Sequence, residues 1–175
     1  MPISKMKNLT LHPLLTLLAA VFSIGSTYAD PINDFSTYQG AWFNIQYPSN
    51  FTVRPSLQSR SNADYDSAFF ASPDGKVKFY IFSPQWNGDP SSDIAIIPEI
   101  EQYEAQQHEI KQAETIRRIT IRAKNGSYTR SYVDIENHQT NTRVVFGITY
   151  QNQTSYDRYK SDYLKFKQSL IQYSD

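Results

Sequence analysis

The stretch Thr115–Glu136, TIRRITIRAKNGSYTRSYVDIE, predicts two β-strands joined by a tight turn. Side chains alternate between the two faces of a strand, so Arg118 and Arg122 share one face and Ile119 lies on the other. The Asn-Gly pair at 125–126 is the strongest short-range signal for a β-hairpin with a two-residue turn. The residues after this pair, Ser127–Glu136, are predicted to form the partner strand. An antiparallel sheet therefore forms the centre of the predicted fold.

A third strand and a second hairpin extend this sheet. TRVVFGITY (Thr142–Tyr150) follows after a short polar turn, and a short connection makes neighbouring strands antiparallel. Upstream, Ser67–Ser72 and Lys76–Ser83 are apolar, strand-like segments on either side of Pro73-Asp74-Gly75. Proline presets the first turn angle and glycine accepts positive φ, so these two segments are predicted to pair.

The sheet is predicted to begin near residue 43. Phe43, Ile45 and Tyr47 alternate with polar residues, which is typical of a strand with one buried face. Pro48 ends the strand because proline has no amide hydrogen to donate to a neighbouring strand. Trp42 lies on the opposite face from the three apolar residues, and it is therefore a candidate contact residue.

The C-terminal segment predicts an amphipathic helix. Its apolar residues recur at steps of three and four, which places them in one stripe on a helix. These residues are Tyr156, Tyr159, Tyr163, Phe166, Leu170 and Tyr173. Thr154, three residues before Asp157, fits an N-terminal cap. We expect this helix to pack across one face of the sheet.

A second helix is predicted near residues 98–109. Pro98 and the acidic Glu99 suit a first helical turn, although the β-branched segment before it favours a strand instead. A helix would place Glu101, Glu104 and His108 on one face, because they are spaced by three and four residues. Carboxylate and imidazole groups in that arrangement can bind Zn²⁺ or Mn²⁺. The alternative is a solvated acidic helix face, in which case no cofactor is expected.

The N-terminus has the pattern of a secretory signal peptide at residues 1–29. Lys5 and Lys7 precede a short apolar segment, Leu14–Ile24, and Ala29 occupies the expected cleavage position. The apolar segment is shorter than the roughly 20 residues that span a bilayer. We therefore expect export to the periplasm or beyond, without stable membrane insertion after cleavage. Residues 30–40 are predicted to be a tether, and residues 41–175 a single domain.

Composition excludes several classes of function. The chain contains no cysteine, which excludes a lipid-anchored lipoprotein, a disulfide framework and a cysteine nucleophile. Its formal net charge is +0, and removal of the two leader lysines makes the remainder slightly acidic. General binding of nucleic acid requires a basic surface, so no nucleic-acid partner is expected.

The order of these segments resembles the PsbP-like family. FNIQYPSNF at residues 43–51 resembles the start of that family's domain, and YDRYKSDYLKFKQSL at 156–170 resembles its end. The family includes photosystem accessory proteins, a Ran-binding nuclear import factor and small exported bacterial proteins. The resemblance implies an α+β fold, in which an antiparallel sheet of about six strands is flanked by helices as an α/β/α sandwich. It also implies a non-catalytic accessory role, but it assigns no functional residue.

The residues suggest two kinds of binding surface. Trp86 lies in a loop rich in turn-forming residues, and tryptophan buries a large area at low entropic cost, so Trp86 is the first candidate contact residue. Arg118, Arg122 and Arg130 lie on the predicted meander and together can grip a carboxylate or a phosphate. Protection of the sheet edge and cross-strand pairing with Asp134 and Glu136 is the alternative role of these arginines. We expect the protein to bind a protein partner or a small ligand.

Two further classes of function stay open. Apart from the leader, the chain contains two histidines, His108 and His138, and no nucleophile or phosphate-binding motif. A hydrolase that uses paired carboxylates remains an alternative, because such a pair has no fixed sequence spacing. An accessory protein that binds a metal ion is the other.

Overall fold

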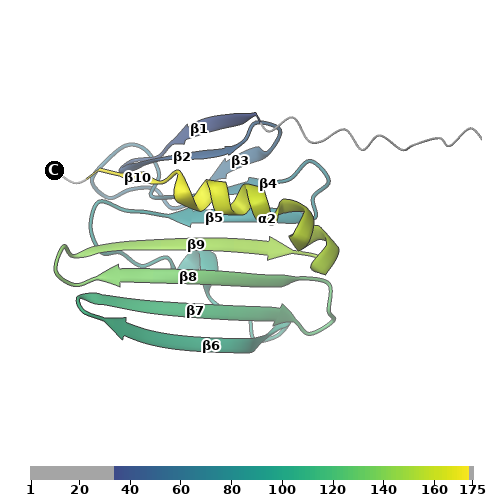
Figure 1. Cartoon of the computed structure of the whole chain (residues 1–175). Coiled ribbons are helices and arrows are strands. Elements are labelled where there is room, and N and C mark those ends of the chain that lie inside the picture. Colours follow the sequence, from purple (N-terminus) through teal and green to yellow (C-terminus); the bar gives the residue numbers. More distant parts are fainter. Residues whose placement is uncertain (1–33, 174–175) are drawn as a thin grey trace, which may run out of the picture. The chain divides into compact units, whose positions relative to one another are not determined.

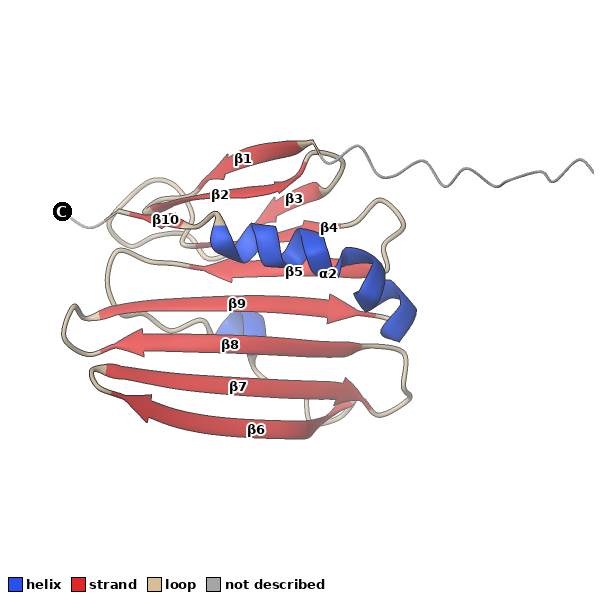
Figure 2. Cartoon of the chain, viewed as in Figure 1, coloured by secondary structure: helices blue, strands red, loops and turns tan. Residues whose placement is uncertain are grey.

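The computed structural model describes residues 34–173 (Figure 1). The predicted signal peptide lies outside the described residues. The described part consists of a seven-stranded sheet, a three-stranded sheet and two helices (Figure 2). All its strand pairs are antiparallel, and the α+β class predicted from the sequence is therefore confirmed.

The larger sheet has the strand order β3-β4-β5-β9-β8-β7-β6. Its strands are β3 (Thr52–Pro55), β4 (Ser67–Ala71), β5 (Val77–Phe82), β6 (Glu101–Lys111), β7 (Glu114–Ala123), β8 (Thr129–Asn137) and β9 (Thr142–Tyr150). The smaller sheet has the order β1-β2-β10, with β1 (Phe35–Gln39), β2 (Phe43–Pro48) and β10 (Ile171–Gln172). The helices are α1 (Ser91–Ile94) and α2 (Gln153–Gln168).

Both predicted hairpins are present, and each has a glycine with positive φ in its turn. Gly75 has φ +67° between β4 and β5, and Gly126 has φ +73° between β7 and β8. The second turn is longer than the predicted two residues. The Ala123 amide donates to the Tyr128 carbonyl at 3.0 Å, and the loop spans residues 124–127. The Asn125 side chain accepts from the Ser127 amide within this loop.

Helix α2 covers one face of the larger sheet over β5 and β9 (Figure 1). Tyr159, Tyr163 and Phe166 of the predicted stripe are buried there. The cap is not the predicted Thr154, because the helix begins two residues earlier than a cap at that position would allow, at Gln153. Asn152 is the N-cap, and its side chain accepts a hydrogen bond from the Ser155 amide at 2.9 Å.

The helix predicted at residues 98–109 is wrong: this segment lies mostly in strand β6. Strand β6 forms the edge of the sheet and pairs with β7 from Glu101 to Lys111. Most of its side chains are exposed on both faces, so the segment lacks the period-two pattern that indicates a strand. Pairing with β7 overrides the helical propensity of its Glu and Gln residues. The predicted tether at residues 30–40 likewise contains a strand, β1, which pairs with β2.

The other face of the sheet is covered by the connection between β5 and β6. This connection, residues 83–100, is called the strap; it contains α1 and lies behind the sheet in Figure 1. Ile94 and Ile96 of the strap pack against a second apolar core. The buried residues of that core are Tyr80, Phe82, Ile121, Tyr132 and Val145. Within residues 34–173, neither helix has the length and apolar character needed to cross a membrane.

Candidate functional site

The strap is fixed to the sheet by the carboxylate of Asp93. Its two oxygens accept hydrogen bonds from Ser56 and Ser67, each at 2.7 Å, and from the Tyr80 hydroxyl at 3.1 Å. Burial, followed by the neighbouring Asp93 charge, raises the pKa of the Tyr80 hydroxyl far above its usual range. Tyr80 therefore stays protonated and donates to Asp93. This places the middle of the strap over β4 and β5.

The guanidinium of Arg130, on β8, provides a second anchor for the strap. It donates to the strap carbonyls of Ile94 at 3.2 Å and Ala95 at 2.7 Å. It also donates to the Tyr132 hydroxyl at 3.0 Å and forms a buried ion pair with Glu101. The predicted ligand contact Arg130 therefore has a structural role, because both its terminal nitrogens are occupied within the protein.

Glu101 completes this buried network. Its carboxylate accepts from the Ile97 amide and from the Tyr128 hydroxyl, each at 2.8 Å, in addition to Arg130. Burial alone would raise the pKa of the Glu101 carboxyl, but these hydrogen bonds outweigh burial and lower the pKa. The group is therefore held as a carboxylate.

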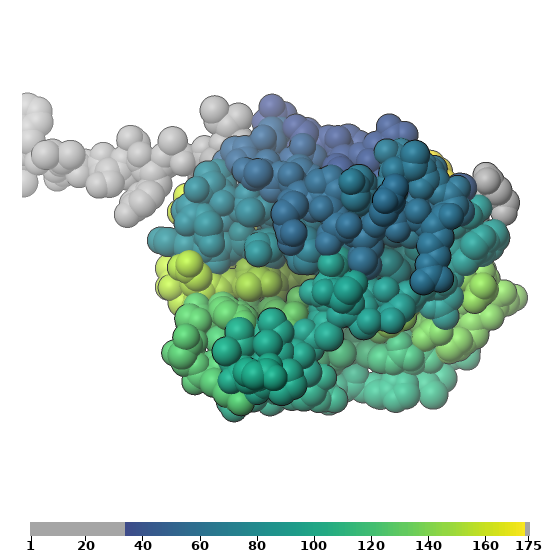
Figure 3. Space-filling view, turned by 180° about the vertical axis from the view of Figure 1, so that it is seen from behind, coloured from purple at the N-terminus to yellow at the C-terminus, as the bar shows by residue number. Residues whose placement is uncertain are grey.

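A third set of contacts fixes the beginning of the strap. Arg143 on β9 donates to the Gly88 carbonyl at 2.6 Å and to both oxygens of the buried Asp134 at 2.9 and 2.8 Å. The Asn87 side chain donates to Glu136 on β8 at 2.6 Å. The strap is thus tied to β4, β5, β8 and β9 along its length, and Figure 3 views the face of the molecule that it covers.

A cavity of about 490 Å³ lies beside the strap on this face. We call it the basic cavity; its lining includes Arg54, Lys76, Lys78, Phe69, Ile97 and Tyr128. The Arg54 guanidinium lies 4.8 Å from the centre of the Phe69 ring, and the Lys78 ammonium lies 5.7 Å from it. Two cations therefore flank one aromatic ring at the wall of the cavity.

The cations of the basic cavity differ from the arginines of the meander. Among residues 34–173, none of Arg54, Lys76 and Lys78 forms an ion pair. The five arginines of strands β7, β8 and β9, here called the meander arginines, are all paired with carboxylates; they are Arg117, Arg118, Arg122, Arg130 and Arg143. Although burial opposes it, hydrogen bonds from the Ser72 hydroxyl and the Lys76 amide lower the pKa of the neighbouring Asp74. The lining also carries the carboxylates of Asp93 and Glu101, but Glu101 is paired with Arg130, so Arg54, Lys76 and Lys78 leave the lining with an excess of positive charge.

The predicted arginine cluster does not form. Arg118 and Arg122 lie on the face of the sheet that carries α2, whereas Arg130 lies on the strap face, because its register partner on β7 is Ile121. Arg118 pairs with Glu109 at 3.2 Å and Arg122 with Glu104 at 3.4 Å, both across the exposed edge of the sheet. Both arginines are thus paired across strands, as in the alternative interpretation, but their partners are Glu109 and Glu104 and not Asp134 and Glu136.

The strand conformation also separates the three residues of the predicted metal site. Glu101 is buried on the strap face, and His108 lies further along β6 opposite Arg117 on that face. The register of β6 shifts at Glu104, which reaches Arg122 on the other face. No group of three or more acidic or histidine side chains within residues 34–173 has the geometry to hold a metal ion.

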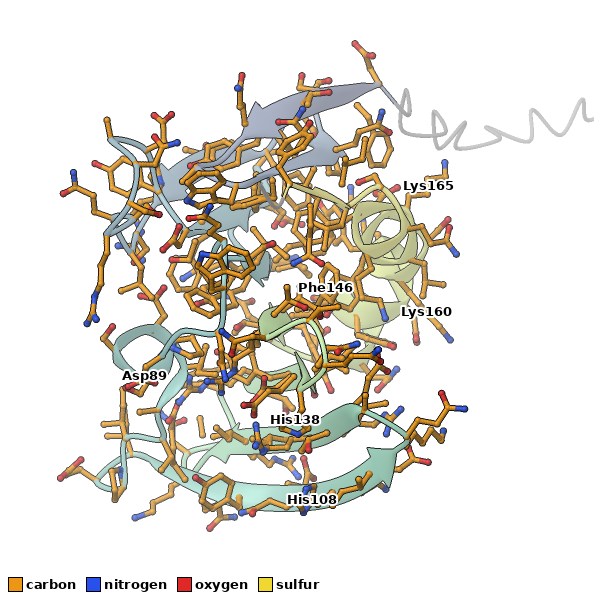
Figure 4. The ribbon with its side chains drawn as sticks, turned by 90° about the vertical axis from the view of Figure 1, so that its left-hand side faces the viewer. Asp89, His108, His138, Phe146, Lys160 and Lys165 are labelled. Atoms are coloured by element: carbon orange, nitrogen blue, oxygen red, sulfur yellow. The ribbon has the colours of Figure 1, made fainter. Side chains whose placement is uncertain are left out.

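His138 lies in the turn between β8 and β9, near the end of the sheet shown in Figure 4. Its Nε2 is 2.7 Å from the Thr115 hydroxyl, and its Nδ1 is 3.9 Å from Glu136. Thr115 is buried, so its hydroxyl is not presented to a substrate. The contact gives a buried hydroxyl a hydrogen-bond partner.

The two tryptophans differ in exposure. Trp42 is half-buried, and its indole nitrogen donates to Ser59 at 3.2 Å and to Ser61 at 3.0 Å. Trp86 lies in the strap and is 44% exposed. Of the two tryptophans, Trp86 is therefore the one that presents more of its surface to solvent.

Sequence reasoning missed the basic cavity. Lys78 alternates with the apolar Val77 and Phe79, which shows that it lies on the opposite face of its strand. The contact between Arg54 and Phe69 depends on the pairing of β3 with β4, two strands that no local pattern joins. No local sequence pattern therefore predicts that Arg54 and Phe69 line one cavity.

No protein-family model matches the sequence, and no curated protein is similar to it. Among solved structures, the chain is similar to cyanobacterial PsbP (CyanoP) from Synechocystis sp. PCC 6803, with 10% identity and a TM-score of 0.48. That likeness covers 86% of this chain and 99% of the other. It is also similar to the Ran-binding protein Mog1p of Saccharomyces cerevisiae, with 9% identity and a TM-score of 0.40 over 81% of this chain and 96% of the other. Both likenesses agree with the PsbP-like fold expected from the sequence.

Proposed function

We propose that this protein is an exported, non-catalytic binding protein that takes a small organic anion into the basic cavity. The proposal rests on a difference in ion pairing between the cations of the basic cavity and the meander arginines. The cations of the basic cavity have no carboxylate partner among residues 34–173, whereas the meander arginines are paired. A cavity that concentrates unneutralised positive charge attracts an anion.

The ligand class follows from the walls of the basic cavity. Its volume of about 490 Å³ suits a small organic molecule. Arg54 and Lys78 provide donors for a carboxylate or a phosphate, and Phe69 holds both cations in place. Ile97 and Tyr128 offer apolar surface to the body of the ligand. An organic anion with an apolar portion satisfies both kinds of wall.

The acids of the basic cavity support binding rather than hydrolysis. A glycosidase requires a carboxylic acid with a raised pKa beside a second free carboxylate. Here the pKa of Glu101 is lowered by its donors, and both oxygens of Asp93 are occupied by hydroxyl groups. Both carboxylates are therefore engaged by donors within the protein.

The test uses the purified protein with benzoate, citrate and a sugar phosphate as probes, measured by calorimetry and thermal unfolding. We expect saturable binding of at least one probe. Replacing both Arg54 and Lys78 with alanine should weaken that binding by about a hundredfold, because two charge-assisted contacts are lost.

The matched control is Lys160→Ala, which removes an exposed lysine from α2 on the other face of the sheet (Figure 4). This variant should bind the probe as the unchanged protein does. Equal losses in both variants, or no binding of any probe, would contradict the proposal.

Export is part of the same proposal, and the pattern of residues 1–29 supports it. Cell fractionation in a Gram-negative host should recover the protein from the periplasm or the medium. Its N-terminal sequence should begin at Asp30. Retention in the cytoplasm with an intact N-terminus would refute export without bearing on the basic cavity.

A further inference from the structure

A second cavity of about 490 Å³ lies between residues 57–61 and the first part of the strap. We call it the tryptophan cavity; its lining includes Gln58, Arg60, Pro84, Gln85, Trp86 and Ser92. It shares no lining residue with the basic cavity. Any ligand of one cavity is therefore separable from a ligand of the other by substitution.

The walls of the tryptophan cavity are held in place by hydrogen bonds. Trp42 donates to Ser59 and Ser61, and the Ser61 hydroxyl donates to the Gln85 side chain at 3.1 Å. On the strap, the Asn87 backbone amide donates to the Asn141 carbonyl at 2.7 Å. Both walls are thus fixed before any ligand enters, which lowers the entropic cost of binding.

Trp86 differs from these fixed walls because its side chain stays 44% exposed. An exposed indole in an anchored loop presents a flat apolar surface at little conformational cost. Around it, the cavity offers hydroxyl and amide groups of serine, glutamine and asparagine, which both donate and accept hydrogen bonds. The lining contains the cation Arg60 and two acidic residues, Asp66 and Asp89, so its charges are mixed.

From this combination we infer that the tryptophan cavity binds a neutral carbohydrate. A sugar ring has an apolar face of C–H groups that stacks on an indole, and its hydroxyls match a rim of donors and acceptors. The mixed charges of the lining give no advantage to a strongly anionic or cationic ligand, in contrast to the basic cavity. The inference does not depend on the function proposed for the basic cavity.

Tryptophan fluorescence provides the test, because Trp86 lines the cavity and Trp42 is bonded to its wall. Maltotriose, cellotriose and chitotriose are titrated into the purified full chain, and binding is confirmed by calorimetry. We expect at least one of them to produce a saturable change in emission at millimolar concentration or below.

Trp86→Ala should weaken this binding by about tenfold or more, and Trp86→Phe should retain part of it, because a phenyl ring still stacks. The unfolding midpoint should fall only slightly, since Trp86 is 44% exposed and lies outside both apolar cores. The control variant, Arg54→Ala with Lys78→Ala, should bind the sugar normally. The inference is overturned if no probe binds, if Trp86→Ala binds as well as the unchanged protein, or if the control variant loses binding.

Discussion

At position 147 the sheet has space for a hydrogen atom and not for a side chain. Gly147 on β9 pairs with Tyr80 on one side and with Tyr132 on the other. A Cβ atom there would lie 2.5 Å from a ring carbon of Tyr132. That ring cannot easily move, because it is buried and its hydroxyl accepts from Arg130.

Gly147→Ala is therefore expected to lower the free energy of unfolding by about 1–3 kcal/mol through overpacking, measured by urea denaturation. In a Tyr132→Ala background the same substitution should cost much less, because the clashing ring is absent. Strictly additive costs in this double-mutant cycle would contradict the assignment.

Glu136 connects the stability of the strap face to pH. The hydrogen bond from Arg117 lowers the pKa of its carboxyl, outweighing the opposing effect of burial, and Asn87 contributes in the same direction. A group whose pKa is lower in the folded state than in the unfolded state stabilises the fold above its unfolded pKa. This stabilisation is lost as the pH falls through the folded pKa.

Glu136→Gln should therefore be less stable than the unchanged protein at about pH 7, and the difference should shrink as the pH approaches about 3. Urea unfolding at a series of pH values measures it. The amide keeps the shape of the carboxylate but only one acceptor oxygen, so the variant removes the charge together with one of the hydrogen bonds from Asn87 and Arg117. A difference that stays constant over this range would show that the Glu136 charge does not contribute.

Among the elements, the strap depends most on a single buried ion pair. Arg130→Ala leaves Glu101 buried without its cation, and removal of one partner of a buried pair costs about 3–5 kcal/mol. The amides of Ile97 and the neighbouring strap residues should also exchange hydrogen faster. Replacing both partners, Arg130→Met with Glu101→Leu, should cost less than Arg130→Met alone. A double variant as unstable as the sum of the single variants would contradict this pairing.

The elements that sequence reasoning found are those with local signals. The hairpins are marked by Gly75 and Gly126, both with positive φ, and α2 by its aromatic stripe. Strand β6 carries no such signal, because an edge strand exposed on both faces needs no apolar alternation. Its position depends on pairing with β7 and on the contact of Glu101 with Arg130, which is 29 residues away in sequence.

The candidate site is less predictable for the same reason. The loop around Trp86 predicts a contact residue, and the structure shows this side chain to be 44% exposed; its contact role stays a prediction. Arg118 and Arg122 share a face as predicted, but Arg130 lies on the other face, because its position depends on the register of β8 against β7. The basic cavity joins β3, β4, β5 and the strap, and those contacts come only from the folded chain.

Across the whole molecule, the larger sheet separates two cores that are stabilised by different kinds of contact. The α2 face is closed by aromatic packing: Phe166 is 0% exposed, and its ring centre lies 5.2 Å from that of Phe70 and 5.3 Å from that of Phe79. The strap face is held by buried polar contacts instead, and it carries both cavities. Stability on the first face should therefore be separable from binding on the second.

Phe166→Ala tests this separation. Loss of a fully buried aromatic side chain is expected to lower the free energy of unfolding by about 3–5 kcal/mol. Leu164→Ala is the matched control on the same helix: Leu164 is 42% exposed, and its loss should cost far less. Ligand affinity in either cavity should be unchanged in Phe166→Ala, provided that binding is measured well below its lowered unfolding midpoint. Reduced affinity in the folded variant would show that the α2 core also shapes the strap face, and the two faces would then have to be treated as one coupled unit.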